Sequence, residues 1–435
     1  MREQESGHFE VGGKKAFYVL AVCSLLHAMC SADWQVMAVV LEPMKRDMAL
    51  SDAQVGLAGS AYFLGVILFV IPVSHLVDAW SRKYMLGLTA IFWSACTLFT
   101  GMGGGFVTLL AARVGVGMGE AGFGPGSTAL VSASFPEGQR AGKLGILNAF
   151  ITVGVVLGVT AGGYLSTTYG WRMPFYVFGV VGIVLGVLAF FMQDYPLKKA
   201  DSTGVANGSL MASLRQLVRI RALRWLWLGL GMNAVLQVSV STWLPALLMR
   251  AYQLPEDKAG YLMGAFTLVG LLGPIIGGIL ADRWQRMHPG GRMRLAAVGA
   301  AMASVFLWLS LVAGLNLHDP VLMYFSAAMM SLHSIGVGMA FPAAAATVQD
   351  IVPARFRSLA WGASIAALFL LGGAWGPLLV GSVSGALGDG YRGIASGLAA
   401  TGLFGLLASA IWWVNARHIR LDGAIIRPDA GSCLP

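Results

Sequence analysis

Long runs of apolar residues alternate with short polar segments along almost the whole chain. A helix needs roughly 20 such residues to cross the hydrocarbon core of a bilayer. Backbone groups in lipid must form their hydrogen bonds within their own segment, so continuous runs predict helices, whereas a membrane barrel shows short alternating segments. The pattern therefore predicts an all-α polytopic membrane protein with twelve transmembrane helices, at residues 16–41, 53–77, 84–104, 106–131, 142–165, 173–193, 225–249, 259–281, 293–315, 320–346, 358–383 and 392–416.

The longest polar break divides these helices into two groups of six. Its first part, DYPLKKADSTGVANGS, is rich in Pro, Gly and Ser and is typical of a flexible linker. Its second part, LMASLRQLVRIRALRW, places apolar and basic residues on opposite faces at helical spacing, which predicts an amphipathic helix at the membrane surface. The predicted organisation is a cytoplasmic tail (1–15), a six-helix bundle (16–193), a cytoplasmic linker with an amphipathic helix (194–224), a second six-helix bundle (225–416) and a cytoplasmic tail (417–435).

Composition supports the membrane class, and the placement of charge supplies an orientation. The chain is 57% hydrophobic and 11% charged, against about 25% charged residues in a typical soluble domain. If the N-terminus is cytoplasmic, 22 of the 29 Lys and Arg residues lie in inner loops and tails and 6 in outer loops; the remaining one, Arg113, is intramembrane. This asymmetry predicts an inner (plasma) membrane protein with both termini cytoplasmic. The net charge of +9 is thereby explained without a nucleic-acid partner.

The two halves repeat each other in matched loops. SHLVDAWSRK, after the second run, aligns with GILADRWQR, after the eighth, so that Asp78 matches Asp282. Arg140, after the fourth run, likewise matches Arg357, after the tenth, and each follows a proline by four residues. Two matched motifs indicate a duplicated six-helix unit.

These loops resemble the signature G-x-x-x-D-R-x-G-R-[RK] of the major facilitator superfamily, and the resemblance covers essentially the whole chain. It implies two pseudo-symmetric six-helix bundles that transport by alternating access, with the loop Asp acting as a latch on the cytoplasmic side. The first copy departs from the signature at Ser74, Ala79 and Ser81, so its latch lacks one expected partner. The cytoplasmic gating residues that the resemblance implies are Asp78, Arg82, Lys83, Arg140, Asp282, Arg283, Arg286 and Arg357.

Within the superfamily the chain is most similar to the Spinster-like branch, whose members transport lysolipids and sphingolipids. The similarity rests on RVGVGMGEAG, FPEGQR, GWRMPF, STWLPALLMR, GGILADRWQR and GPLLVGSVSG, several of which recur in organic-anion symporters of the same superfamily. Both branches usually carry Asn-x-x-Asp-Arg in the first helix. This chain has Cys30-Ser31-Ala32-Asp33-Trp34 there, so the usual basic partner is absent.

Gly117-Met118-Gly119-Glu120-Ala121-Gly122 matches the dinucleotide-binding pattern G-x-G-x-x-G. That chemistry requires a preceding strand and a βαβ unit, and this pattern lies inside a long apolar run. Gly115, Gly119 and Gly122 or Gly126 instead recur at three- and four-residue spacing and make a smooth helix face for close helix packing. The sequence favours packing over a cofactor.

Three ionisable residues lie deep in apolar runs, namely Asp33, Arg113 and Glu120. Charged groups in a bilayer interior are costly, usually paired and usually functional. The superfamily arrangement places the first and fourth helices around the central cavity, so we expect these residues to converge. A buried carboxyl group can exchange a proton near neutral pH, since burial disfavours its charged form. The three are the predicted proton and substrate coupling site; the alternatives are a permanently paired structural triad and, for Arg113, a side chain that extends to the membrane surface.

Further candidates for the cavity wall are polar and tryptophan residues within the apolar runs. Each of them has a packing alternative, because helices also use amides, His and Trp to pack and to anchor at interfaces. These candidates are Trp34, Asn233, Gln237, Trp243 and His333.

Together the patterns predict a secondary active transporter that moves an amphiphilic, lipid-like or small organic solute across the inner membrane by proton-coupled symport or antiport. A proton-coupled importer of organic anions and a transport-inactive membrane receptor remain as alternatives. No nucleophile constellation, phosphate-binding loop or metal-ligand spacing is present, so the sequence predicts no enzyme activity, no catalytic residues, no bound cofactor and no metal, with the proton as coupling ion. The expected partners are the substrate and the bilayer, and the expected state is a monomer.

Overall fold

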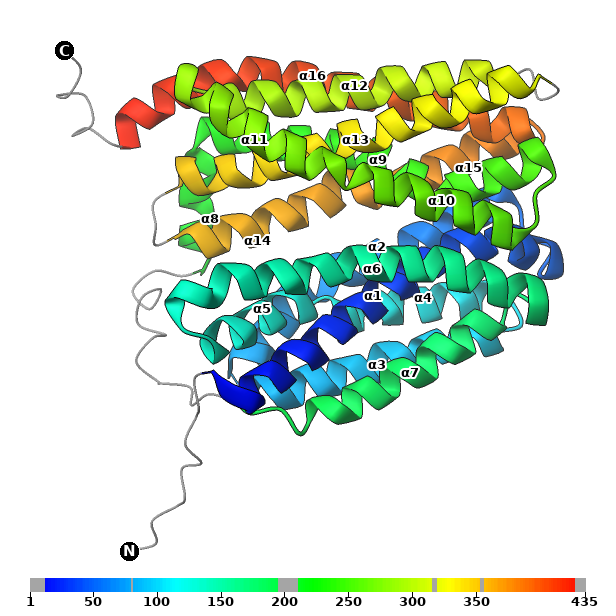
Figure 1. Ribbon diagram of the computed structural model, residues 1–435, viewed down its shortest axis with the longest axis horizontal. Helices are drawn as coiled ribbons and strands as arrows, with labels where there is room; N and C mark the ends of the chain where they lie inside the picture. Colours follow the sequence, from blue (N-terminus) through cyan, green and yellow to red (C-terminus); the bar gives the residue numbers. More distant parts are fainter. Residues whose placement is uncertain (1–11, 80, 195–209, 315–318, 353–355, 427–435) are drawn as a thin grey trace, which may run out of the picture. The chain divides into compact units, whose positions relative to one another are not determined.

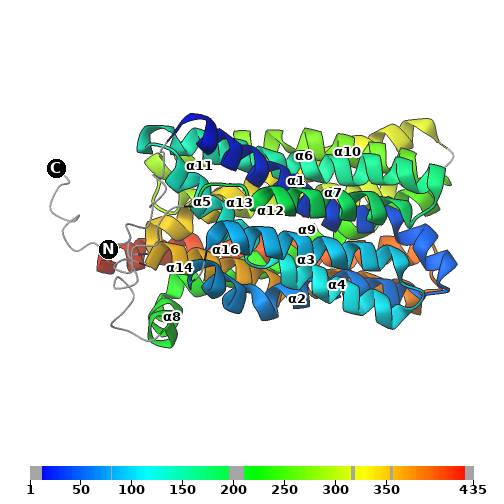
Figure 2. The same cartoon turned by 90° about the horizontal axis from the view of Figure 1, so that it is seen from below.

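The computed structural model describes residues 12–79, 81–194, 210–314, 319–352 and 356–426, and its regular elements are all helical there (Figures 1 and 2). The first eight helices are α1 (Gly13–Asp47), α2 (Asp52–Ala79), α3 (Arg82–Met102), α4 (Phe106–Glu120), α5 (Phe123–Ser134), α6 (Glu137–Tyr169), α7 (Met173–Ala189) and α8 (Leu210–Arg219). The others are α9 (Arg221–Tyr252), α10 (Glu256–Gly270), α11 (Leu272–Met287), α12 (Gly291–Ala313), α13 (Pro320–Ile351), α14 (Arg357–Leu368), the π-helix η3 (Phe369–Gly373), α15 (Gly376–Ala386) and α16 (Tyr391–Ile426).

The predicted class, an all-helical polytopic membrane protein, is confirmed. Eleven helical segments of the described chain are long and apolar enough to cross a membrane. The sixth predicted run appears as α7, which is apolar but shorter than these segments. Several predicted single helices are interrupted: the fourth run consists of α4 and α5, and the eighth consists of α10 and α11. The eleventh passes through η3, a type of interruption that is frequent at functional sites.

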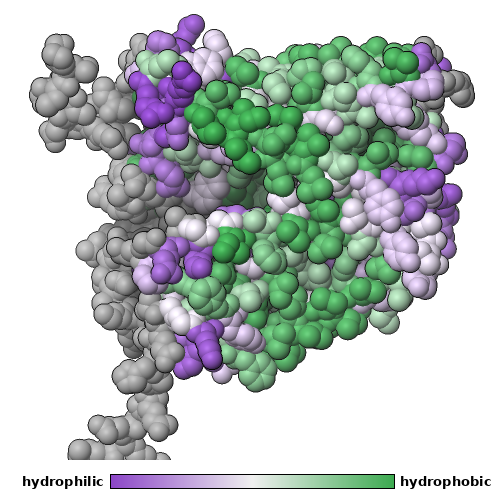
Figure 3. Space-filling view, viewed as in Figure 1, coloured by the Kyte–Doolittle hydropathy of each residue, from purple (hydrophilic) through white to green (hydrophobic). Residues whose placement is uncertain are grey.

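The helices group into two compact units. One unit contains Met1–Met48 and Ala61–Lys199; the other contains Ala49–Ser60 and Ala200–Pro435. In the first unit α1 packs along α6 and α3 along α7, and in the second α12 packs against α13 and α16. The first turns of α2 belong to the second unit, and the rest of this helix belongs to the first. The pattern of apolar residues did not predict this division. On the face that Figure 3 shows, apolar side chains cover most of the surface between the helix ends, and hydrophilic ones gather at the ends.

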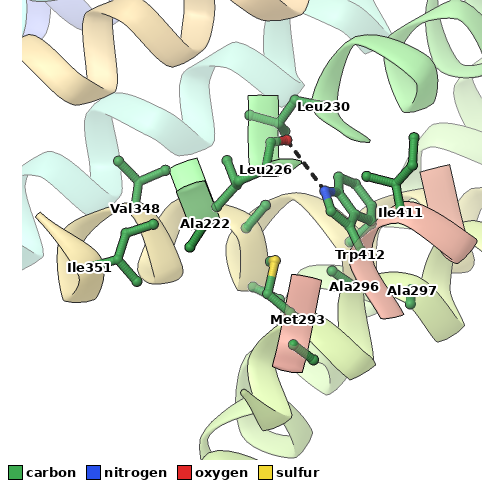
Figure 4. Packing of buried hydrophobic residues seen from close by; sticks show 14 of the residues in the cluster. Ala222, Leu226, Leu230, Met293, Ala296, Ala297, Val348, Ile351, Ile411 and Trp412 are labelled. Carbon is green, nitrogen blue, oxygen red and sulfur yellow. Dashed lines mark hydrogen bonds between the residues drawn. The ribbon is translucent and has the colours of Figure 1, made fainter. Parts of the chain in front are cut away.

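The core of the second unit lies where α9, α12, α13 and α16 meet (Figure 4). Trp412 is fully buried there, and its indole N–H donates to the carbonyl of Leu226 at 3.4 Å. The predicted amphipathic helix is present as α8, and its Leu217 is fully buried in the same cluster. This helix therefore contacts the rest of the second unit through Leu217, while Val218 remains exposed.

A buried ion pair fixes the start of α2 within the second unit. Arg250 of α9 donates to both carboxylate oxygens of Asp52 at 2.6 and 2.7 Å, and Ser384 of α15 donates a third hydrogen bond to the same carboxylate at 2.5 Å. The side chains of Asp52 and Arg250 are 0% and 11% exposed. A bidentate, hydrogen-bonded geometry of this kind is what a buried pair needs to offset the cost of desolvation.

We predict that Asp52→Asn destabilises the protein by about 3–5 kcal/mol, because it removes the carboxylate that compensates a buried guanidinium. Thermal unfolding of the purified protein in one fixed detergent measures the effect. Asp47→Asn is the matched control, since the side chains of its pair, Arg172 and Asp47, are 37% and 47% exposed. Equal melting temperatures for Asp52→Asn and wild type would show that the buried pair contributes nothing to stability.

Candidate functional site: a buried charged cluster in the first unit

The glycine-rich stretch that precedes the cluster serves helix packing. A Cβ atom at Gly117 would overlap the carbonyl oxygen of Tyr62 in α2. At Gly119 it would lie 2.7 Å from the Cβ of Trp93 in α3, and at Gly122 it would overlap a methyl group of Val73. Only hydrogen fits at these positions, so the glycines let α4 approach α2 and α3 closely. The packing interpretation of G-x-G-x-x-G is confirmed.

We predict that Gly117→Ala lowers the free energy of unfolding by about 1–3 kcal/mol, since the added methyl group meets backbone rather than a flexible side chain. Gly124→Ala, one helix further on, is the control because no atom lies within 4 Å of the point that its added methyl group would occupy. Thermal unfolding and membrane expression compare the two variants. Equal melting temperatures and expression levels for the two variants would show that the close contact between α2 and α4 does not contribute to stability.

The three predicted coupling residues all lie buried in the first unit. Asp33 and Arg113 are each 1% exposed, and Glu120, at the C-terminal end of α4, is 6% exposed. Asp33 and Glu120 both lie within the range of electrostatic interaction with Arg113. The structure therefore brings the acid of α1 and the cation and acid of α4 into one cluster.

Neutral hydroxyl groups, rather than cations, hold the two carboxyl groups. Thr97 of α3 donates a hydrogen bond to Asp33 at 2.6 Å, and Tyr62 of α2 donates one to Glu120 at 2.6 Å. The ring of Tyr62 also lies 5.5 Å from the guanidinium of Arg113, a cation–π distance. Tyr62 and Thr97 were not predicted. The sequence shows only that both are hydrogen-bonding side chains within apolar runs. Many Ser and Thr residues of this chain share that feature, so it does not distinguish these two.

The cluster retains unused hydrogen-bonding capacity. One oxygen of Asp33, one oxygen of Glu120, and Nε and one terminal nitrogen of Arg113 are buried without a hydrogen-bond partner. Within the described part of the chain, no nitrogen of Arg113 lies within 4.0 Å of a carboxylate oxygen. This geometry differs from a permanently paired triad. Buried polar atoms normally have partners, so these groups have the capacity to bind a proton, water or a polar part of a ligand.

The contacts of the further candidates for the cavity wall distinguish packing residues from residues with unused polar groups. Trp243 is fully buried and its indole N–H donates to the carbonyl of Pro377 at 3.1 Å, while His333 is 3% exposed with a ring nitrogen 2.7 Å from the carbonyl oxygen of Ala303. Both side chains therefore take part in helix packing. Asn233 is buried and its side-chain oxygen has no partner, whereas Gln237 and Trp34 are partly exposed.

The second copy of the loop motif forms an ion-pair network. Arg292, at the start of α12, donates to Asp282 at 2.6 and 3.1 Å and also binds Asp350 at the end of α13. Arg292 and Asp350 were not predicted, because both lie outside the motif. The predicted motif residues Arg283 and Arg286 are exposed.

In the first copy of the loop motif, Ser81 stands where the superfamily signature has Gly, and its side chain forms hydrogen bonds that glycine cannot form. Ser81 caps α3 and donates to Asp194 at 2.5 Å, and the amide of Lys83 donates to the same carboxylate at 3.5 Å. Arg140 donates to the carbonyl of Phe135 at 3.1 Å, and Arg82 is partly buried. The side chains of Asp78 and Arg357 lie outside the part that the structure describes.

A polytopic helical protein with a buried charged cluster has the features expected of a membrane carrier. A sequence profile of the Major Facilitator Superfamily matches residues 23–377, so the chain belongs to that superfamily of transporters and is a multi-pass membrane protein.

Individual relatives refine this assignment. The chain is 27% identical to an MFS-type efflux pump of Mycolicibacterium smegmatis over 94% of its length and 95% of the relative. It is 28% identical to protein spinster homolog 1 of Bos taurus over 86% of its length and 73% of the relative. A solved bacterial homolog of the human lysosomal transporter Spinster, in an inward-facing and unoccupied conformation, aligns with a TM-score of 0.82, 22% identity and coverage of 94% and 99%. The predicted resemblance to the Spinster-like branch is thus confirmed.

Proposed function

We propose that this transporter couples proton movement to the passage of an amphiphilic solute across the inner membrane by alternating access. The observation that carries the proposal is the buried cluster of Asp33, Arg113 and Glu120, in which the carboxyl groups contact hydroxyls and Arg113 keeps unpartnered nitrogens. A carboxyl group that is not committed to an ion pair can bind and release a proton as its surroundings change. The proton is the coupling ion in this proposal.

The mechanism follows from the charges of the cluster. With both acids ionised, the field of two carboxylates opposes the binding of an anion beside Arg113. Protonation of Glu120 removes one of these charges and leaves the guanidinium available to an anionic head group. Proton binding and substrate binding then favour each other, which is the requirement for coupling.

The amphiphilic substrate class rests on the resemblance to the Spinster-like branch, to which the spinster homolog reported above belongs. An anionic head group suits the unpartnered nitrogens of Arg113. The same nitrogens suit a small organic anion, which therefore remains the second candidate substrate. A membrane receptor that does not transport is the third possibility.

Reconstituted transport tests the proposal. Proteoliposomes containing the full chain are given a pH gradient and either a lysolipid with an anionic head group or a short dicarboxylate. Acceleration of lysolipid movement by the gradient supports the proposal, and acceleration of dicarboxylate movement alone transfers the mechanism to the second candidate. The absence of both substrate movement and proton flux would favour the receptor.

The orientation gives a separate prediction. With both termini cytoplasmic, single cysteines introduced between residues 194 and 224 should react with an impermeant maleimide only in inside-out vesicles. A cysteine at Asp257, before the second turn of α10, should react only in intact spheroplasts. Reversed labelling of the two positions would overturn the orientation.

A further inference from the structure

The second unit contains a cavity to which the proposed mechanism assigns no role. Its volume is about 320 Å³, and it lies beside the C-terminal half of α9, among α10, the end of α12 and the start of α13. Leu244, Leu248, Phe266 and Met330 form part of its wall, and each is 8% exposed or less. No residue of the cluster of Asp33, Arg113 and Glu120 lines it.

The chemistry of the wall suits hydrocarbon. No charged side chain is among the described residues that line the cavity. The two serine hydroxyls of the wall, those of Ser310 and Ser326, lie 3.0 Å apart, and each also bonds the other's backbone carbonyl. They are therefore satisfied without a ligand. An apolar cavity of this kind excludes water and binds apolar molecules, and even a 150 Å³ engineered cavity binds benzene.

One side of the cavity opens towards the apolar surface of the unit. The lining residues Leu262, Met323 and Tyr324 are 37%, 39% and 71% exposed, in contrast to the buried wall on α9. Leu262 belongs to α10 and the other two to α13, so the opening lies between these helices. Both helices are membrane-span candidates, and hydrocarbon chains are what surrounds such a surface. Tyr324 also places a phenol hydroxyl near the opening, a common arrangement where an apolar surface meets a polar layer.

We propose that this cavity is a binding site for a single alkyl chain of an amphiphile, which enters between α10 and α13. Since a cavity of about 150 Å³ holds benzene, which has six carbons, about 320 Å³ accommodates on the order of ten chain carbons. Two acyl chains of a phospholipid do not fit together, so one chain inserts and the head group stays outside. The site takes hydrocarbon from either a bilayer lipid or a free single-chain amphiphile.

Photolabelling of the purified full chain in phosphatidylcholine nanodiscs tests the site. The probe is a straight-chain ten-carbon alcohol with a diazirine near its terminal methyl group, and mass spectrometry locates the adducts. We expect adducts on residues 244–252 and 323–330. Unlabelled alcohols should compete with an affinity that rises about fourfold for each added methylene up to about ten carbons and then levels off.

A matched pair of variants makes the test specific. Ala327 lines the cavity, whereas its neighbour Ala328 is exposed and does not. Ala327→Phe should fill the cavity and reduce labelling of these peptides at least tenfold, while Ala328→Phe should label like wild type. Equal labelling of both variants would overturn the site. If Ala327→Phe does not accumulate, the competition series in wild type decides, since competition without dependence on chain length contradicts a cavity of defined depth.

A second experiment, with the diazirine placed in the nanodisc lipid, identifies the source of the bound alkyl chain. Adducts from the labelled phospholipid at the same peptides identify a bilayer chain as the occupant, and adducts from the added alcohol alone identify a free amphiphile. Neither measurement uses a proton gradient. Loss of the proposed coupling would therefore leave this inference intact, and loss of labelling would leave the coupling intact.

Discussion

Glu120→Gln should abolish the response of transport to a pH gradient while leaving substrate exchange. The amide accepts the hydrogen bond from Tyr62 as the carboxyl group does, so the local geometry is preserved. It cannot bind a proton, however, and in the proposed mechanism the proton that binds at Glu120 supplies the coupling free energy with the substrate. The ratio of uptake with and without an imposed gradient should fall to about one. Proteoliposome uptake and counterflow of the same lysolipid measure the two activities.

Asp319→Asn is the control for this measurement. Asp319 caps α13 in an exposed position, and Asn caps helices as well as Asp, so its pH response should equal that of wild type. Unaltered pH dependence in Glu120→Gln would remove this residue from the coupling mechanism. If the variant does not reach the membrane, Asp33→Asn provides the corresponding test, because Thr97 holds that carboxyl group in the same manner.

Arg113→Met should reduce transport of an anionic lysolipid by a factor of roughly 30 or more, which corresponds to about 2 kcal/mol for a buried charge pair that loses one partner. Methionine keeps an unbranched apolar side chain but lacks the guanidinium. A monoacylglycerol with the same chain should lose far less, because its head group makes no ion pair. Initial rates for the two substrates in the same vesicle preparation give the comparison.

Arg113→Lys separates charge from geometry. Lysine keeps the positive charge but lacks the planar fork of donors, so we expect partial transport of the anionic lysolipid. Equal losses for the anionic and neutral substrates in Arg113→Met would instead assign Arg113 to balancing the charge of Asp33 and Glu120. In that case the head group is recognised elsewhere.

The class of protein could be predicted from the sequence because its cause is local. A lipid environment requires each apolar run to satisfy its own backbone, so length and composition alone predict helices. Charged residues inside such runs are conspicuous for the same reason, and Asp33, Arg113 and Glu120 could be selected without any knowledge of contacts. The packing role of Gly115 and Gly119 was equally predictable, since their four-residue spacing defines one helix face, and both meet α3.

Contacts between distant segments could be decided only by the tertiary structure. Tyr62 and Thr97 look like ordinary residues of apolar helices, and only the packing of α2 and α3 against the charged cluster gives their hydroxyls carboxyl partners. Arg292 and Asp350 join Asp282 because α11, α12 and α13 bring these residues to the same side of their unit. The ion pair between Asp52 and Arg250 spans 198 residues. A hydrogen bond or ion pair depends on the position of two groups to within a few tenths of an ångström, and residue spacing along one helix carries no information about the helix it meets.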